Sequence, residues 1–360
     1  MLKIGLIGCG KISDSHAEQI RRIPDCEIIS VCDKEELMAK QFCDRFQVKN
    51  YFTDVNEFLR NDRPDVVHIT TPPQSHFDLG KVCLEAGCHV YIEKPFTVHA
   101  EEAEHLIELA KEKNLKIIPG HDDQFTHATR RMREYIKIGY LGGPPIHMES
   151  YYCYDLGEQS YANALLGEKG HWVRNLPGKL LHNIISHGIC RIVEYLKGDN
   201  PLIIAHAFTS NFLMQIGENE IRDELRVIIN DENNTTAYFT FSSQMRPSLH
   251  HFRVFGSKNG LVVDHDHQTV ITLRGLKYKS YLDKFIPPWN FGIQYLKNSA
   301  HNIKLFLKRD FHMKSGMKFL IEAFYRSIRG DASLPISYRE TLMTARIMDE
   351  IFRQIYPKIK

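Results

Sequence analysis

The chain has 360 residues, of which 43% are hydrophobic and 25% are charged, and its formal net charge is +2. This composition is typical of a folded protein long enough for two domains, and it gives no strong positive field for binding nucleic acid. No run reaches the ~20 apolar residues that span a bilayer, and no N-terminal segment resembles a signal peptide. The eight cysteines include no Cys-x-x-Cys pair. We therefore expect a cytoplasmic protein with reduced thiols.

The first elements in the chain are a predicted strand, a tight turn and a helix. Residues 3–7 are apolar and lead into Gly8-x-Gly10, and an amphipathic helical pattern begins at Lys11 and Ile12. Gly8 permits the turn, and Gly10 removes the side chain that would keep backbone N–H groups away from a pyrophosphate. The N-terminus of the helix adds partial positive charge at the same place. We therefore predict a dinucleotide site formed by Gly8, Gly10, Lys11 and Ile12.

Asp33 supplies the second part of this predicted site. It ends a second β-like run, residues 27–32, about 20 residues after the turn, where a carboxylate hydrogen-bonds the adenosine ribose. A 2′-phosphate there would meet like charge, so the sequence favours NAD over NADP, although the adjacent Lys34 weakens that preference. The alternative is that Asp33 is a solvated loop residue.

Strand and helix patterns alternate through the first 120 residues. In order, we predict helix 35–46, strand 51–52, a helix opening at Asp54, strand 65–70, helix 75–86, strand 88–92, helix 99–113 and strand 115–118. Strands separated by helices of this length form βαβ units with right-handed crossovers. The predicted fold class is α/β, with an N-terminal Rossmann domain built on a doubly wound parallel sheet.

The pattern changes after His121. We predict helices at 127–138 and 183–197, strands at 202–209, 225–230, 236–242, 250–255, 260–264 and 269–273, and a final helix at 338–356. Hairpin signals lie between several of these strands. We therefore expect a C-terminal α+β domain with a largely antiparallel open sheet. The predicted boundaries are 1–121 for the Rossmann domain, 122–337 for the second domain, and 338–360 for a helix that packs back on the body.

Two further motifs follow strands at the same edge of the predicted first sheet, where parallel α/β sheets bind their ligands. Thr70-Thr71-Pro72-Pro73-Gln74-Ser75-His76 follows one strand, and Glu93-Lys94-Pro95 follows the next. We predict cofactor contacts from Thr70, Thr71, Pro73, His76, Glu93 and Lys94. Lys94 is also expected to donate a hydrogen bond to a substrate hydroxyl. The alternatives are that Glu93 and Lys94 form a surface pair and that His76 only caps its helix.

This set of motifs resembles the Gfo/Idh/MocA oxidoreductases, the relatives of glucose–fructose oxidoreductase, inositol dehydrogenase and sugar-nucleotide dehydrogenases. The glycine turn, the Thr-Pro-Pro motif and Glu-Lys-Pro carry the resemblance, and residues 120–125 and 138–144 look like later segments of that family. The resemblance covers nearly the whole chain. It implies NAD-dependent hydride transfer to or from a secondary alcohol of a sugar, cyclitol or sugar nucleotide, with Lys94 polarising the reacting oxygen.

The family's second catalytic segment has the pattern Asp-x-x-x-His on a helix. The matching stretch here, residues 177–187, has Asn183 in the Asp position and His187 in the His position. Residues four apart lie on one helical face, so we expect these two side chains to be neighbours. The resemblance makes His187 the acid/base residue, whereas the amide of Asn183 orients groups but cannot exchange a proton. The alternatives are a core histidine and a helix-start asparagine.

Substrate contacts are predicted from four residues: His121, Trp172, Arg174 and His182. His121 belongs to a segment that resembles the family, and His182 lies within the stretch that matches the catalytic segment, next to Asn183. The indole of Trp172 is suited to stack on a sugar face, and the guanidinium of Arg174 is suited to bind a carboxylate or phosphate. The alternatives are a core tryptophan and a surface arginine. No metal site is predicted.

Residues 277–318 depart from the family pattern. Basic residues outnumber the two acidic residues, Asp283 and Asp310, and large apolar residues are interleaved with them. We interpret the segment first as a substrate-side lid or a subunit contact, with peripheral contact to an anionic membrane as the alternative. The family also suggests a homodimer or homotetramer formed through the sheet of the second domain.

Three functions remain open at this stage. The preferred one is a dehydrogenase acting on a sugar nucleotide, as in surface-polysaccharide synthesis. The absence of Asp at position 183 instead fits a non-catalytic NAD-binding regulator. A third is an epimerase or eliminase that cycles its cofactor without net release of NADH.

Overall fold

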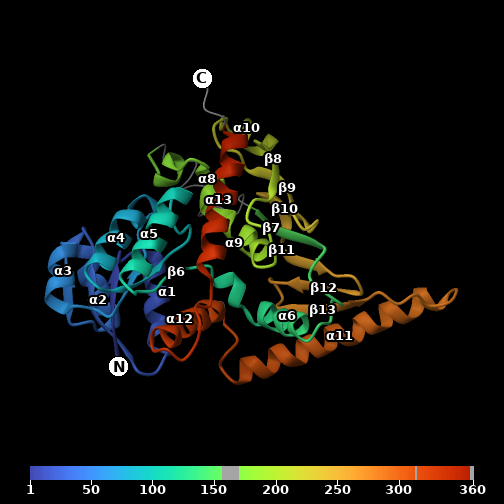
Figure 1. The fold of residues 1–360 in the computed structure, drawn as a ribbon, viewed down its shortest axis with the longest axis horizontal. Helices are drawn as coiled ribbons and strands as arrows, with labels where there is room; N and C mark the ends of the chain where they lie inside the picture. Colours follow the sequence, from blue (N-terminus) through green and yellow to red (C-terminus); the bar gives the residue numbers. More distant parts are fainter. Residues whose placement is uncertain (156–169, 313, 357–360) are drawn as a thin grey trace. The chain divides into compact units, whose positions relative to one another are not determined.

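The computed structural model describes residues 1–155, 170–312 and 314–356. Contacts within the chain divide it into two compact units (Figure 1), one formed by residues 1–122 and 316–349 and the other by residues 123–315 and 350–360. Residues 316–337 were expected in the second domain but group with the first unit. The last four residues of the expected C-terminal segment 338–360 lie outside the described residues.

In the described part of the chain, the first unit contains a six-stranded sheet in which every neighbouring pair is parallel. The strand order is β3-β2-β1-β4-β5-β6. Strands β2 and β3 are added on one side of β1 and strands β4 to β6 on the other, so the topological switch point lies between β1 and β4. The strands are β1 (Leu2–Ile7), β2 (Cys26–Cys32), β3 (Asn50–Phe52), β4 (Val66–Ile69), β5 (His89–Ile92) and β6 (Ile117–Pro119). This is the doubly wound arrangement predicted from the alternating pattern.

Five helices connect these strands: α1 (Lys11–Ile20), α2 (Glu36–Phe46), α3 (Val55–Asp62), α4 (His76–Glu85) and α5 (Ala100–Glu112). Two later helices, α12 (Ser315–Ile328) and the first part of α13 (Tyr338–Ile355), belong to the same unit. A buried cluster joins Val67 and Val90 of the sheet to Phe58, Leu84 and Leu106 of the helices. Burial of this apolar surface is what fixes the strand ends that carry the site.

The described residues of the second unit form a seven-stranded sheet with the order β13-β12-β11-β7-β10-β9-β8. All neighbouring pairs are antiparallel except β10 and β7. Its strands are β7 (His147–Asp155), β8 (Leu202–Phe208), β9 (Glu224–Asn230), β10 (Thr236–Ser242), β11 (Gln244–Phe255), β12 (Asn259–Asp264) and β13 (Thr269–Arg274). The predicted fold class, a parallel Rossmann sheet followed by a largely antiparallel one, is confirmed.

The described residues of this unit include the helices α6 (His127–Lys137), α8 (Lys179–Ile184), α9 (Ser186–Val193), α10 (Asn211–Gln215) and α11 (Leu282–Leu307), and the end of α13. Helix α9 packs on β7 and β10 at a glycine, since a Cβ on Gly188 would lie 2.1 Å from Cε2 of Phe239. That close approach brings the face of α9 that carries His187 near the sheet. Among the described helices, none has the length and apolar content needed to cross a bilayer.

Candidate functional site

The glycine turn between β1 and α1 has the geometry that its sequence predicts. Gly8 has φ +94°, and a Cβ there would lie 2.7 Å from Cγ2 of Thr71, so both the backbone and the space require glycine. Gly10 is different: its φ is −77°, and a Cβ there would meet no atom within 4 Å. Gly10 therefore opens space at the N-terminus of α1, where a phosphate group is favoured.

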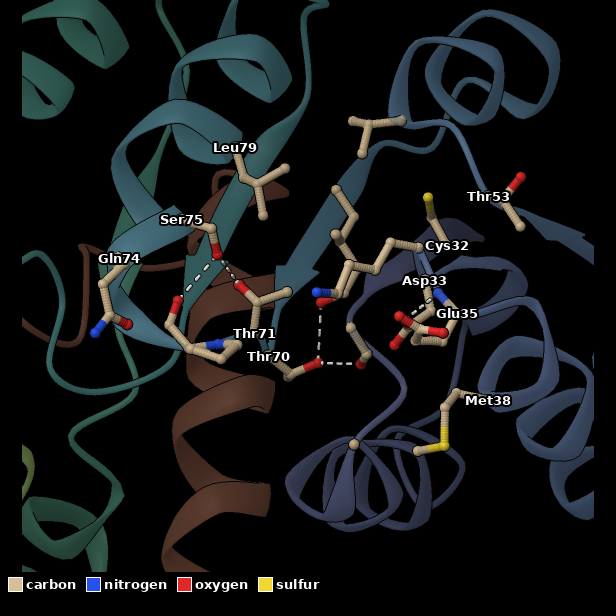
Figure 2. A pocket seen from close by; sticks show the side chains of 16 residues that line it. Cys32, Asp33, Glu35, Met38, Thr53, Thr70, Thr71, Gln74, Ser75 and Leu79 are labelled. Atoms are coloured by element: carbon tan, nitrogen blue, oxygen red, sulfur yellow. Dashed lines mark hydrogen bonds between the residues drawn. The ribbon is translucent and has the colours of Figure 1, made fainter. Parts of the chain in front are cut away.

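A cavity of about 600 Å³ lies at this turn, which is the size of a small-molecule site (Figure 2). Figure 2 shows Asp33, Glu35 and Met38 on one side of it and Thr71 and Gln74 on the other. The lining residues that the sequence predicted are Gly8, Gly10, Asp33, Thr70 and Thr71. They come from the ends of β1, β2 and β4, so the predicted carboxyl edge of the sheet is where the cavity is found.

Asp33 is held in place by two backbone N–H groups. Cys9 donates to its Oδ2 at 2.6 Å, and Glu35 donates to its Oδ1 at 2.9 Å. A carboxylate has about four acceptor positions, so both oxygens keep capacity for ribose hydroxyls. Lys34, next to Asp33 in the sequence, also lines the cavity. The position of Asp33 fits a nucleotide whose ribose carries two free hydroxyls.

The Thr-Pro loop after β4 forms the opposite wall. The hydroxyl of Thr70 donates to the carbonyl oxygen of Gly8 at 2.6 Å, and the hydroxyl of Ser75 donates to that of Thr71 at 2.8 Å. His76 does not line the cavity: it is fully buried, and its ring nitrogens lie 2.9 and 2.8 Å from the carbonyl oxygens of Pro95 and Thr71. These two contacts tie the Thr-Pro loop to the Glu-Lys-Pro loop, and a contact of His76 with the cofactor stays a prediction.

The remaining predicted cofactor contacts also lie outside the lining of this cavity. They are Lys11, Ile12, Pro73, Glu93 and Lys94. Lys94 is half-buried at the end of β5, and the carboxylate of Glu93 accepts from its backbone N–H at 3.1 Å. Glu93 is 5% exposed, so the surface pair weighed against a functional motif is excluded.

Behind Lys94 runs a chain of buried hydrogen bonds that sequence reasoning missed. Glu93 Oε1 lies 2.8 Å from Nε2 of His16, whose Nδ1 lies 2.9 Å from Nδ1 of His68. Nε2 of His68 in turn lies 2.8 Å from the hydroxyl of Tyr325 in α12. Both imidazoles and the phenol are fully buried, and Tyr91 stacks on His68 with ring centroids 4.7 Å apart.

The surroundings of Glu93 and His68 determine the charge state of each side chain. Burial raises the pKa of Glu93, but its hydrogen bond with His16 and the charges of His16 and Lys94 together lower that pKa to about 2. Burial lowers the pKa of His68 well below its usual value, so His68 is neutral. His16 therefore donates through Nε2 to an ionised Glu93, which fixes the residue preceding Lys94.

The second unit holds a separate group of polar side chains around His187. Its Nδ1 lies 2.9 Å from Oδ2 of Asp123, and Arg191 approaches the same oxygen at 3.2 Å. The imidazole stacks on Tyr152 of β7, with centroids 4.9 Å apart and an interplanar angle of 8°. Burial raises the pKa of Asp123, but His187 and Arg191 hold that pKa well below its ordinary value. Asp123 is therefore an anion that orients the ring.

The predicted pair Asn183 and His187 does not lie on one helix. Helix α8 ends at Ile184 and α9 begins at Ser186, with a turn at Ile185 between them. The carboxylate that meets the imidazole is Asp123, from the turn Asp122–Phe125. The sequence analysis noted residues 120–125 for their resemblance to the family, but it predicted only His121 among them as a site residue and so missed Asp123.

The predicted substrate contacts have other surroundings. Arg174 forms an ion pair with Glu218 at 2.7 Å, and both side chains are about nine-tenths buried, so its charge is compensated within the protein. His182 is 1% exposed and stacks on Phe352 with centroids 4.6 Å apart, as a core histidine does. Trp172 is half-buried and stacks on its neighbour His171. His121 is buried in the first unit.

Comparison with known proteins bears on the first unit most directly. Residues 2–121 match the family described as an oxidoreductase family with an NAD-binding Rossmann fold, Gfo/Idh/MocA. Over these residues the chain is similar to the Gfo/Idh/MocA oxidoreductases. The matched family has an NAD-binding Rossmann fold, and the glycine turn, the cavity and Asp33 described above lie within the matched residues.

Two relatives of this kind illustrate which enzymes the chain resembles. UDP-N-acetylglucosamine 3-dehydrogenase of Acidithiobacillus ferrooxidans is 32% identical over 149 residues, which are 41% of this chain and 44% of that protein. Myo-inositol 2-dehydrogenase of Thermotoga maritima is 25% identical over 145 residues, 40% of this chain and 43% of that protein. The matched segments thus span little more than two fifths of these relatives.

The fold of the whole chain has known counterparts. An NAD-binding oxidoreductase from Klebsiella pneumoniae covers 99% of this chain and 97% of its own, with a TM-score of 0.79 and 19% identity. At that identity the likeness establishes the fold, including the second unit, and nothing about the substrate.

Proposed function

We propose that this protein is an NAD-dependent dehydrogenase that transfers hydride to or from a secondary alcohol of a sugar, cyclitol or sugar nucleotide. The observation that carries the proposal is the cavity at the carboxyl edge of the first sheet, which Gly10 and Asp33 line, within the residues that match the Gfo/Idh/MocA family. The position of Asp33 supports NAD rather than NADP, because a 2′-phosphate would meet its charge.

In the proposed reaction, one side chain would bind the substrate's reacting oxygen and another would accept its hydroxyl proton. Lys94, fixed by the buried carboxylate of Glu93, would donate a hydrogen bond to the hydroxyl and stabilise charge on its oxygen. His187 would take the hydroxyl proton on Nε2, because its Nδ1 faces Asp123. Asp123 would stabilise the imidazolium so formed. Bound NAD supplies the hydride acceptor.

The Asp123–His187 pair bears on the alternative that this is a non-catalytic NAD-binding regulator. That alternative drew on Asn183, which cannot exchange a proton. The structure pairs the histidine with a different carboxylate, so the loss of Asp at position 183 leaves the imidazole with an acidic partner. This supports a catalytic role for His187.

A sugar nucleotide is the substrate class we favour, in surface-polysaccharide synthesis. The support is the 32% identical match to a UDP-N-acetylglucosamine 3-dehydrogenase over 41% of this chain. We also propose a homodimer or homotetramer formed through the second sheet, since Ile204, Ile228 and Tyr238 on β8, β9 and β10 are each about half exposed. Sedimentation velocity tests the oligomer.

The test of activity is nicotinamide absorbance of the purified protein with NAD, recorded before and after addition of free sugars, inositols and UDP-sugars. Reduction of NAD by one class, lost in His187→Ala, is the expected result. NAD binding with no turnover of any compound would favour the regulator. Substrate conversion without net NADH would instead indicate an epimerase or eliminase.

A further inference from the structure

Helix α11 is attached to the second sheet by one face only. Asn298 of α11 accepts from the backbone N–H of Val270 and donates to its carbonyl oxygen, both at 3.0 Å. One helical turn earlier, Gln294 makes the same pair of contacts with Thr272, at 2.7 and 3.2 Å. Val270 and Thr272 belong to β13, the edge strand of this sheet, so the two amides occupy the hydrogen-bonding groups of that edge.

These contacts fix the rotation of α11 about its axis and therefore which side chains point outward. Figure 1 shows the helix along the β13 edge of its unit. Leu282, Trp289, Leu296 and Ile303 recur every seven residues and lie roughly half a turn from Asn298. Trp289 is 73% exposed and Leu296 is 72% exposed. We call the outward row the apolar face of α11; its exposed members are Leu282, Phe285, Trp289, Ile293, Leu296, Ile303 and Leu307.

An exposed apolar row of this length needs a partner, because large apolar side chains gathered on one face are unfavourable in water. The charges of α11 decide which kind. Helix α11 contains one acidic residue, Asp283, against three basic ones, Lys284, Lys297 and Lys304. Two more basic residues and one acidic residue, Lys308, Arg309 and Asp310, follow it directly. A second copy of α11 would bring the same excess of positive charge to the contact, with only Asp283 to compensate it.

We propose that α11 lies flat on an anionic membrane surface through this apolar face. Trp289, Phe285 and Leu296 would enter the boundary between headgroups and acyl chains, and Lys297 and Lys304 would meet lipid phosphates. The aromatic content supports this, because tryptophan and tyrosine favour the membrane–water interface. The sequence had favoured a lid or a subunit contact for residues 277–318, of which residue 313 lies outside the described residues. The outward orientation of the apolar face disfavours a lid, and the excess of positive charge on α11 favours an anionic membrane over a second copy of the chain.

The proposal is tested by co-sedimentation of the full chain with vesicles, some of pure phosphatidylcholine and some of an equal mixture of phosphatidylcholine and phosphatidylglycerol. Trp289→Ser/Leu296→Ser removes two members of the apolar face. The matched control is Leu37→Ser/Ile138→Ser, which changes two side chains that are 66% and 77% exposed elsewhere. Lys297→Gln/Lys304→Gln tests the charge. NAD affinity of every variant reports that the chain is folded.

We expect the wild-type chain to sediment with the mixed vesicles and not with pure phosphatidylcholine. The apolar-face variant should bind at least about tenfold more weakly and the lysine variant about tenfold more weakly, while the control binds as the wild type does. Absence of wild-type binding to the mixed vesicles would overturn the proposal. So would self-association of the wild type that the apolar-face variant abolishes while vesicle binding persists unchanged, since that face would then belong to a second copy of the chain.

Discussion

Nδ1 of His187 lies 2.9 Å from Oδ2 of Asp123, although the two residues are far apart in the sequence. The imidazole of α9 is thereby oriented by a charged carboxylate, and Nε2 is the nitrogen left for proton exchange. An Asp–His pair of this kind holds the ring in one tautomer and stabilises its protonated form. The general base of the proposed reaction thus has its own acidic partner within the second unit.

Replacing Asp123 should affect turnover more than replacing Asn183. In Asp123→Asn the ring loses its anionic partner, and we expect kcat to fall by roughly 10²-fold with a smaller change in KM. Asn183→Ala should lower kcat by less than about tenfold. Steady-state kinetics over a range of pH would show the difference, since only Asp123→Asn should shift the pH at which kcat falls as the general base becomes protonated. Equal losses in the two variants would contradict this assignment.

The two glycines of the turn should respond differently to the same substitution. Gly8→Ala places a Cβ at positive φ and 2.7 Å from Thr71, so we expect the free energy of unfolding to fall by about 1–3 kcal/mol. Gly10→Ala meets no protein atom, so stability should change little while NAD affinity falls. Thermal unfolding without cofactor and NAD titration by fluorescence measure the two effects. Unchanged NAD affinity in Gly10→Ala would place the pyrophosphate elsewhere.

Asp33 should set the choice between the two nicotinamide dinucleotides. In Asp33→Asn the amide keeps an acceptor for Cys9 or Glu35 but removes the negative charge. We expect NAD to bind roughly tenfold more weakly, and the ratio of NAD to NADP affinity to narrow, because the repulsion of a 2′-phosphate is gone. Binding titrations with both nucleotides test this. A ratio that stays at its wild-type value would show that other groups exclude the phosphate.

The buried chain from Glu93 to Tyr325 predicts how stability depends on pH. The pKa of Glu93 is about 2 in the folded protein and near its ordinary value of 4.5 when unfolded. The unfolded state therefore binds more protons in between, so stability is full above pH 4.5 and is lost as the pH falls toward 2, by on the order of 2–3 kcal/mol. His68 adds a loss that begins below pH 6.5, because only the unfolded state readily protonates it.

Denaturant unfolding at several pH values measures this dependence, and Glu93→Gln supplies the control. The variant should be less stable than the wild type at neutral pH and should lose less stability on acidification. Tyr325→Phe leaves Nε2 of His68 without its partner and should cost about 1–3 kcal/mol at neutral pH. A wild-type protein whose stability is flat between pH 6.5 and 3 would contradict the assigned charge states.

The parts of the fold that could be predicted from the sequence are those that depend on patterns among neighbouring residues. The alternating strands and helices of the first 120 residues and the glycine turn depend on local pattern, and they were found where expected. Strand β7 was missed, although it lies at the centre of the second sheet, because its tyrosines, serine and glutamate give no simple apolar alternation. Helix α11 was missed as a helix because Pro287 and Pro288 interrupt its pattern.

In the candidate site, too, the residues set by local sequence pattern could be predicted and those set by tertiary packing could not. Asp33 could be predicted because a fixed spacing from the glycine turn brings the end of β2 to the cavity. The partner of His187 could not, because Asp123 reaches it through tertiary packing rather than helical spacing. Arg174 and His182 were chosen by residue type alone, and burial beside Glu218 and Phe352 decided their roles. The His16–His68 contact likewise joins segments that no local pattern connects.

The central claim is that a bound nicotinamide cofactor exchanges hydride with a sugar-related alcohol and that His187 carries the proton. The most direct measurement is nicotinamide absorbance during incubation with NAD and UDP-sugars, for the wild type and for His187→Ala, with NAD affinity of both measured in parallel. The account predicts NADH formation with one substrate class in the wild type, none in the variant, and equal NAD affinity. NADH formation at the wild-type rate in His187→Ala would contradict it.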